Sequence, residues 1–462
     1  MQFDSVGFFL AAGPVILISY LFPQRIRNWF LVLLSLLFCA AFSWSSLFVL
    51  VGLILVTYGF SIFLEKNPSK PLFVLACILC AGLLVLFRFY DPSSGILFSK
   101  QIPFSFAVPV GVSFYTLNAI SYLSDLYTGK LDRKLPFVTL ALFLSFFPTV
   151  TSGPLMRAGE FAQEADREKP FAYEPIRDGF LLLLIGYVMK LVIAGRCALM
   201  VNHVYMDESL RGFPVVLAVL LYSLEIYTDF AGYSLIAKGL AKALGFAVPD
   251  NFHQPYFSAS IREFWRRWHM SLSGWLKDYV YIPLGGSHGS RWFKFRNLIL
   301  TFLVSGFWHG RGMTFLFWGL LHALFQIGED LSASFVTWKN PDGFGHRAVT
   351  FLLVTFAWIF FASTGMSQAL SILARCFSLE NYGSIFTPAV CEWGLDARNW
   401  CFLGAGLMVL LPVDLMEYHD ISVLAWFGKR NRFEKLILVW ICVLLAVFSL
   451  NLSGSEFIYM QF

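Results

Sequence analysis

The sequence predicts an all-α protein that crosses a membrane many times. Hydrophobic residues make up 58% of the 462-residue chain and charged residues only 14%, whereas a soluble domain carries roughly 25% charged residues. A soluble globule of this length would still need a polar surface, so the missing charge indicates a bilayer environment. The apolar runs do not alternate as the strands of a membrane barrel do. Backbone groups in lipid must then be satisfied within helices.

About eleven of the apolar runs are expected to cross the bilayer and to surround a central cavity, because a spanning helix needs about 20 apolar residues. Several runs are short, and some of these are expected to re-enter the membrane instead of crossing it. The candidate runs begin near residues 6, 30, 46, 71, 104, 137, 179, 213, 298, 313, 348, 398 and 434.

Basic residues in the first loops indicate the orientation, because cytoplasmic loops are enriched in Lys and Arg. The second loop, around Ser43 to Ser46, has none, and the fourth has Arg88 and Lys100. The first, third and fifth loops hold a larger basic set, namely Arg25, Arg27, Lys66, Lys70, Lys130, Arg133 and Lys134. These odd-numbered loops are therefore expected to be cytoplasmic, which places the N-terminus outside.

Two charged segments, residues 155–178 and 249–297, interrupt the apolar runs. Both are expected to lie at the membrane interface, the second as short interfacial or re-entrant helices. No internal repeat or low-complexity linker separates the chain into parts. The sequence therefore predicts a single membrane-embedded domain over residues 1–462.

Charge and cysteine content argue against several classes of function. The net charge of +5 is modest and no long basic run indicates nucleic-acid binding. Cys77 and Cys80 form a CxxC within an apolar run, which is typical of helix residues and not of a metal or redox site. The eight histidines are scattered, so neither a metal site nor a bound cofactor is expected.

The segment IREFWRRWHMSLSGWLKDY, which begins at Ile261, combines charge and aromatic residues. Read as one helix, it places an i,i+4 pair, Glu263 and Arg267, on one face. Another face carries Trp265, Trp268, His269 and Leu272. One interpretation is an amphipathic helix lying in the membrane interface. The other is a cationic, aromatic mouth that binds an anionic or carbonyl-bearing substrate and presents His269.

His309 lies between two apolar runs, with no carboxylate within ten residues on either side. A polar residue at such a depth needs a partner or a function. It is either a core histidine bonded to a carbonyl or a neutral base at the bottom of a narrow cavity. The flanking Gly306 and Gly310 suit a close approach by a ligand or another backbone. His322, thirteen residues further on, is interpreted as structural.

Glu225 and Asp229 share one helical face in an otherwise apolar run. They could relay protons, or they could pair with the arginines of residues 262–267. The ion pairs are the preferred interpretation, because residues 262–267 contain three arginines.

Six segments, in order along nearly the whole chain, resemble one known family. They are PVGVSFYTLNAISYLSDLYTG (109–129), FFPTVTSGPLMRAGEF (146–161), YTDFAGYSLIAKGLAKALGFAVPDNFHQPY (227–256), SIREFWRRWHMSLSGWLKDYVYIPLGG (260–286), VSGFWHG (304–310) and SEFIYMQF (455–462). These segments resemble the membrane-bound O-acyltransferases. The likeness is greatest to the bacterial branch that contains the alginate O-acetylation membrane protein, and is more distant to the D-alanyl transfer protein of teichoic acid modification.

The resemblance implies an O-acyltransferase of the bacterial cytoplasmic (inner) membrane, with His309 as the catalytic residue and His269 as its companion. It implies acetyl-CoA as the acyl donor and hydroxyls of an exported polysaccharide as acceptors, reached directly or through an extracytoplasmic partner transferase. His309 would remove the hydroxyl proton or carry the acyl group as acyl-imidazole, and His269 would orient the acyl donor or stabilise the oxyanion. The expected substrate-binding residues are Arg266, Trp268, Lys277, Asp278, Trp308 and Asn251.

Two other functions remain open on the sequence. A transporter or flippase for a polymer or a lipid-linked sugar would use the same aromatic and cationic residues without covalent chemistry. The sequence shows no inverted repeat of the kind many transporters have. The second open function is D-alanyl transfer to a cell-envelope polymer. The YIPLGG string favours acetylation over D-alanyl transfer.

Overall fold

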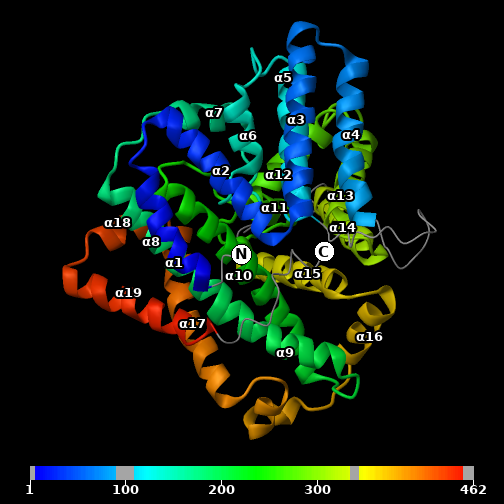
Figure 1. Cartoon of the computed structure of the whole chain (residues 1–462). Coiled ribbons are helices and arrows are strands. Elements are labelled where there is room, and N and C mark those ends of the chain that lie inside the picture. Colours follow the sequence, from blue (N-terminus) through cyan, green and yellow to red (C-terminus); the bar gives the residue numbers. More distant parts are fainter. Residues whose placement is uncertain (1–5, 90–108, 333–342, 451–462) are drawn as a thin grey trace. The chain divides into compact units, whose positions relative to one another are not determined.

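The computed structural model describes residues 6–89, 109–332 and 343–450, and all the regular secondary structure in these ranges is helical (Figure 1). The all-α prediction is therefore confirmed. Lys100 of the fourth loop, the start of the run near residue 104 and the segment at 455–462 lie outside the described residues.

Seven of the described helical stretches are long and apolar enough to cross a membrane. The protein is thus a multi-pass membrane protein, although the count of eleven spans is not confirmed. The expected runs near residues 6, 137 and 434 form helices of only 14, 9 and 16 residues. The seven stretches are Gln24–Phe42, Trp44–Lys66, Lys70–Phe87, Tyr173–Met206, Phe213–Ala243, Phe344–Ala362 and Ala397–Tyr418.

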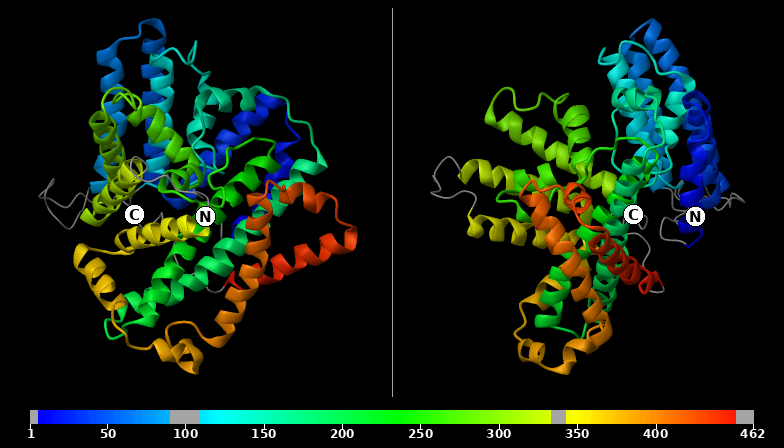
Figure 2. Two further views of the ribbon diagram at one scale, coloured as in Figure 1. Left: turned by 180° about the vertical axis from the view of Figure 1, so that it is seen from behind. Right: turned by 90° about the vertical axis from the view of Figure 1, so that its left-hand side faces the viewer.

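One compact unit comprises Met1–Phe180 and Ala237–Pro249. In it, α3 and α4 form a hairpin that packs on α5 (Figure 2). Cys77 and Cys80 lie within α4, as expected. The helices are α1 (Val6–Ser19), α2 (Gln24–Phe42), α3 (Trp44–Lys66), α4 (Lys70–Phe89), α5 (Val112–Tyr127), α6 (Phe137–Ser145), α7 (Ala158–Asp166) and the start of α8 (Tyr173–Tyr187).

Arg27, expected in a cytoplasmic loop, is instead buried near the start of α2. Its guanidinium donates hydrogen bonds to the carbonyl oxygens of Lys169, at 3.2 Å, and Leu244, at 2.8 Å. Arg25 is exposed. Of these two basic residues, Arg27 thus serves the packing of this unit and only Arg25 is available at the surface.

The second unit comprises Leu181–Ile236 and Asp250–Phe462. The single-domain expectation stays a prediction. The helices of this unit are the end of α8, η1 (Val188–Ala194), α9 (Gly195–Met206), α10 (Phe213–Ala243, which ends in the first unit), η2 (Pro255–Phe257), α11 (Ile261–Arg267), α12 (Met270–Leu276), η3 (Lys277–Tyr281), α13 (Arg291–His309), α14 (Met313–Ser332), α15 (Phe344–Ala362), α16 (Met366–Cys376), η4 (Tyr382–Phe386), η5 (Pro388–Glu392), α17 (Ala397–Tyr418), α18 (Val423–Gly428) and α19 (Arg432–Val447).

A π-helical turn, η1, joins α8 to α9 in one continuous stretch. Its Lys190 forms a buried ion pair with Asp229 of α10, with 2.6 Å between Nζ and Oδ1. The preferred pairing of Asp229 with the arginines of 262–267 is therefore wrong. Lysine reaches this carboxylate because Gly186 and Gly232 let the two helices cross closely: a Cβ at either glycine would come within 2.7 Å of the other's carbonyl oxygen.

The helices α13 and α14 form a tightly packed hairpin (Figure 1). A Cβ on Gly306 would lie 2.4 Å from the carbonyl oxygen of Phe315, and one on Gly319 would lie 2.3 Å from that of Phe302. Small residues thus allow the two backbones to approach. Gly306 therefore serves the contact between α13 and α14. His309 is the last residue of α13, three residues after this glycine.

The charged segment 249–297 contains short helices, as expected, but not the single helix from Ile261 onward. Helix α11 ends at Arg267, and His269 adopts a left-handed conformation (φ 43°, ψ 53°) before α12 begins at Met270. The alternative reading of one continuous amphipathic helix is therefore wrong. The predicted pair within α11 does form, with 2.7 Å between Arg267 Nη2 and Glu263 Oε1.

Candidate active site

His269 sits in a backbone conformation that L-residues rarely adopt. A non-glycine residue in the left-handed region costs about 1–3 kcal/mol and persists only where its surroundings fix it. The side chain is fully buried, and its ring meets the edge of Phe230 at a centroid distance of 4.6 Å. Strain of this kind clusters at functional sites. The left-handed conformation of His269 between α11 and α12 therefore makes this residue a candidate for function.

Asn251 supplies the contacts that fix this turn. Its Oδ1 accepts hydrogen bonds from the backbone N–H of Ser271, at 3.2 Å, and from the Ser271 hydroxyl, at 2.7 Å. The same oxygen lies 3.1 Å from Nδ1 of His269. The backbone N–H of Met270 donates to the Asn251 carbonyl at 2.9 Å. One asparagine therefore contacts the strained residue and the two residues that follow it.

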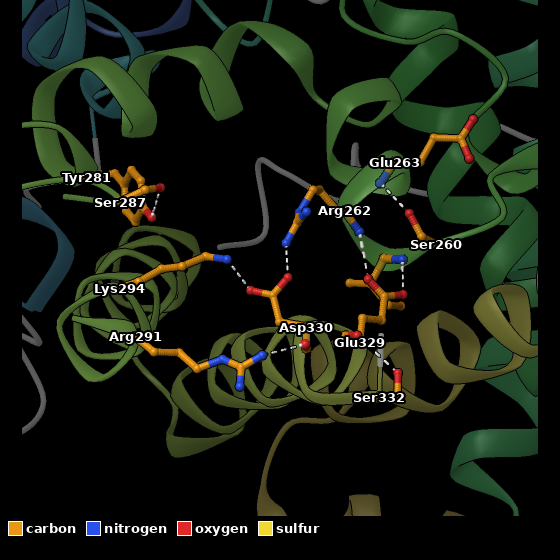
Figure 3. Close-up of polar contacts among 11 residues, drawn as sticks. Ser260, Arg262, Glu263, Tyr281, Ser287, Arg291, Lys294, Glu329, Asp330 and Ser332 are labelled. Atoms are coloured by element: carbon orange, nitrogen blue, oxygen red, sulfur yellow. Dashed lines mark hydrogen bonds and ion pairs between the residues drawn. The ribbon is translucent and has the colours of Figure 1, made fainter. Parts of the chain in front are cut away.

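The start of α11 is held by acidic residues at the end of α14 (Figure 3). Glu329 accepts hydrogen bonds from the backbone N–H groups of Ile261, at 2.5 Å, and Arg262, at 3.4 Å. A carboxylate there satisfies amides that have no partner within the helix. Asp330 lies between Arg262 and Lys294, pairing with both (Figure 3). The segment that ends at His269 is thus anchored at its other end to α14.

His309 is the last residue of α13 and is only 3% exposed. Its imidazole packs against the rings of Trp308, Trp318 and Phe361, at centroid distances of 4.8, 5.0 and 5.4 Å. Trp308 also lies 6.2 Å from the ring of His269. The structure therefore brings the two sequence-predicted histidines to the same indole, from segments forty residues apart in the chain.

His322 belongs to the same aromatic cluster. It is fully buried, and its Nδ1 accepts a hydrogen bond from the indole N–H of Trp265 at 3.2 Å. Trp318 contacts both His322 and His309, at ring centroid distances of 5.1 and 5.0 Å. The apolar run around His322 gave little reason to connect it with the other two histidines. The i,i+4 spacing of Trp318 and His322 on α14 is the signal that could have done so.

The other expected site residues fall into two groups. Trp268, Trp308 and Asn251 are buried with the histidines, and Trp268 packs on Trp358 at 5.1 Å. Arg266 and Lys277 are exposed, and Asp278 is half-buried in η3. The buried group can shape a site around the imidazoles, whereas Arg266 and Lys277 offer positive charge at the surface.

Burial governs the protonation of groups in this region. It lowers the pKa of His269 to about 3, so the ring is neutral near pH 7. Burial also raises the pKa of Glu329, while hydrogen bonds from the Ile261 and Arg262 amides act in the opposite direction. A neutral imidazole has one ring nitrogen that carries a lone pair and one that carries a proton, so it can accept one hydrogen bond and donate another.

The sequence matches the model of the membrane-bound O-acyltransferase family over residues 128–373. It is 32% identical to a protein of Pseudomonas syringae pv. tomato named "Probable alginate O-acetylase AlgI", over 94% of this chain and 83% of that protein. The chain belongs to the membrane-bound O-acyltransferase family. It is therefore an O-acyltransferase, and the matched range contains both predicted histidines and Asn251.

Two further relatives carry other names. The peptidoglycan O-acetyltransferase of Helicobacter pylori is 32% identical over 100% of this chain and 95% of its own. The teichoic acid D-alanyltransferase of Bacillus subtilis is 32% identical over only 46% of this chain and 57% of its own. The similarity of this chain to the peptidoglycan O-acetyltransferase thus extends over its whole length. Its similarity to the teichoic acid D-alanyltransferase covers less than half of it.

Proposed function

We propose that this O-acyltransferase moves acetyl from acetyl-CoA toward hydroxyls of an exported cell-envelope polysaccharide, directly or through an extracytoplasmic partner transferase. The observation that carries the proposal is the meeting of His269 and His309 at Trp308 in a buried aromatic cluster. The relatives named as alginate and peptidoglycan acetylating proteins support acetyl as the acyl group.

In the proposed reaction, the acceptor hydroxyl oxygen attacks the thioester carbonyl carbon and its proton passes to a neutral imidazole. The carbon–sulfur bond then breaks, and the thiolate takes up a proton from the imidazolium. The ester and free CoA are the products, and the histidine returns to its starting state. General-base assistance of this kind contributes roughly 10²–10⁴-fold to the rate.

The proposed setting is the bacterial inner membrane, with the N-terminus outside and acetyl-CoA reaching the site from the cytoplasm. The exposed basic residues Arg266 and Lys277 suit the phosphates of that acyl donor. The rest of the expected binding set is Trp268, Trp308, Asp278 and Asn251.

Mass spectrometry of the exported glycans tests the proposal in the native cell, with and without the gene. Loss of glycan acetyl groups, restored by the wild-type protein but not by His309→Gln, is the expected result. Loss of polymer export with unchanged acetylation would instead indicate a transporter or flippase. Loss of D-alanyl ester with intact acetyl ester would indicate D-alanyl transfer.

A further inference from the structure

The orientation of the Asn251 side-chain amide is determined by its neighbours. The backbone N–H of Ser271 can only donate, and it points at one terminal atom of the amide at 3.2 Å. That atom must therefore be the oxygen, because an NH₂ group there would face another donor. The amide nitrogen then lies 3.2 Å from the hydroxyl oxygen of Ser234, to which it donates.

The oxygen fixed in this way also lies 3.1 Å from Nδ1 of His269. An amide oxygen has no proton to give, so a hydrogen bond between the two atoms requires that Nδ1 carries the proton. A neutral imidazole has only one ring proton, so its lone pair is then on Nε2. The contact thus selects one of the two tautomers of His269.

His322 provides an internal contrast. The indole N–H of Trp265 can only donate, and it does so to Nδ1 of His322. The same reasoning places the His322 proton on Nε2. The two buried histidines are therefore held in opposite tautomers by two different partners.

We propose that Asn251 is a positioning residue that holds His269 as the Nδ1–H tautomer, so that Nε2 is the His269 nitrogen that can accept a hydrogen bond during acyl transfer. This inference rests on the proposed function. It changes the role expected for His269, because Nε2 of a neutral ring in this tautomer cannot donate to an oxyanion.

The left-handed turn supports the same assignment. Asn251 bonds the backbone N–H groups of both Met270 and Ser271, the two residues that follow His269. The Asn251 side chain thus holds the imidazole and the Ser271 amide, and the Asn251 carbonyl holds the Met270 amide. The orientation of the His269 ring therefore depends on Asn251.

The first test reads the tautomer directly. Solid-state NMR of the full-length protein, labelled with ¹⁵N-histidine in lipid bilayers, distinguishes protonated from unprotonated ring nitrogens. The His269 signals are assigned by their loss in His269→Gln. We expect Nδ1 to be protonated and Nε2 to be unprotonated, and the reverse assignment would overturn the proposal. This readout needs no turnover.

The second test measures transfer of acetyl from acetyl-CoA by folded protein. Asn251→Asp keeps an oxygen facing Nδ1, so the tautomer should persist and kcat should stay within about tenfold of wild type. Asn251→Ala releases the tautomer. In the serine-protease triad an imposed wrong tautomer lowers kcat by ~10⁴-fold, so we expect a loss between about 10-fold and 10⁴-fold, with KM for acetyl-CoA little changed.

A matched control removes a different buried, hydrogen-bonded asparagine. Asn28 of α2 donates to the carbonyl of Ala165 at 2.9 Å, and Asn28→Ala should leave the His269 tautomer and kcat unchanged. Full kcat in Asn251→Ala, or an equal loss in the Asp and Ala variants, would contradict the proposal. A wild-type protein with the expected tautomer but no acetyl transfer would instead reject the proposed function, and with it the role of the His269 tautomer in that reaction.

Discussion

The ion pair between Lys190 and Asp229 is buried inside the second unit. The side chains are only 6% and 8% exposed, and Nζ and Oδ1 are 2.6 Å apart. Removing one partner of such a pair leaves an uncompensated buried charge, which costs about 3–5 kcal/mol. Replacing both partners by apolar residues of similar size is often neutral or stabilising.

We therefore expect Lys190→Met and Asp229→Leu each to lower the free energy of unfolding by about 3–5 kcal/mol. The double variant should recover most of that loss. Denaturant unfolding in mixed micelles measures all three values and yields the coupling energy between the two positions. Lys66→Met replaces an exposed lysine at the end of α3 and should stay within about 0.5 kcal/mol of wild type.

Single variants as stable as the Lys66→Met control would refute this reasoning, because the pair would then carry no buried charge. A double variant no better than the singles would refute it as well. Acetyl transfer by a stable double variant adds a second measurement. Normal turnover would show that the pair serves the packing of η1 on α10. Lost turnover would support the interpretation that Glu225 and Asp229 relay protons.

Four further predictions concern the site and the membrane. His309→Gln should fold, judged by monodisperse elution in detergent, yet lose acyl transfer by ~10²–10⁴-fold; near-normal turnover would exclude a catalytic role. Because burial lowers the pKa of His269, its ring stays neutral when folded and binds a proton when unfolded below about pH 6.5. Stability should thus fall as the pH drops from about 6.5 toward 3, less so in His269→Gln. Cysteines placed at Arg25 and beside Lys134 should label from the cytoplasm, and labelling from outside would reverse the topology. Acetyl-CoA should be preferred over palmitoyl-CoA in a direct competition assay, and the opposite preference would indicate a lipid-modifying enzyme.

Much of the architecture follows from local sequence patterns. Runs of apolar residues specify membrane helices because the cost of an unsatisfied backbone group in lipid leaves few other structures. Ser260 precedes α11 and accepts a hydrogen bond from the Glu263 amide at 3.0 Å, which is the local capping contact that serine commonly makes at a helix start. The motifs around His269 and His309 indicated the family, which the relatives confirm.

Only the tertiary structure decided how these residues are used. Helical periodicity favoured one continuous helix through His269, but contacts from Asn251, eighteen residues earlier, stabilise a left-handed break there. Likewise, Asp229 is paired with Lys190, because two glycines bring α8 and α10 together. Periodicity reports which residues share a face of one helix. It carries no information on which residue of another segment will meet that face, and in a buried setting this partner sets the charge, the tautomer and the backbone conformation.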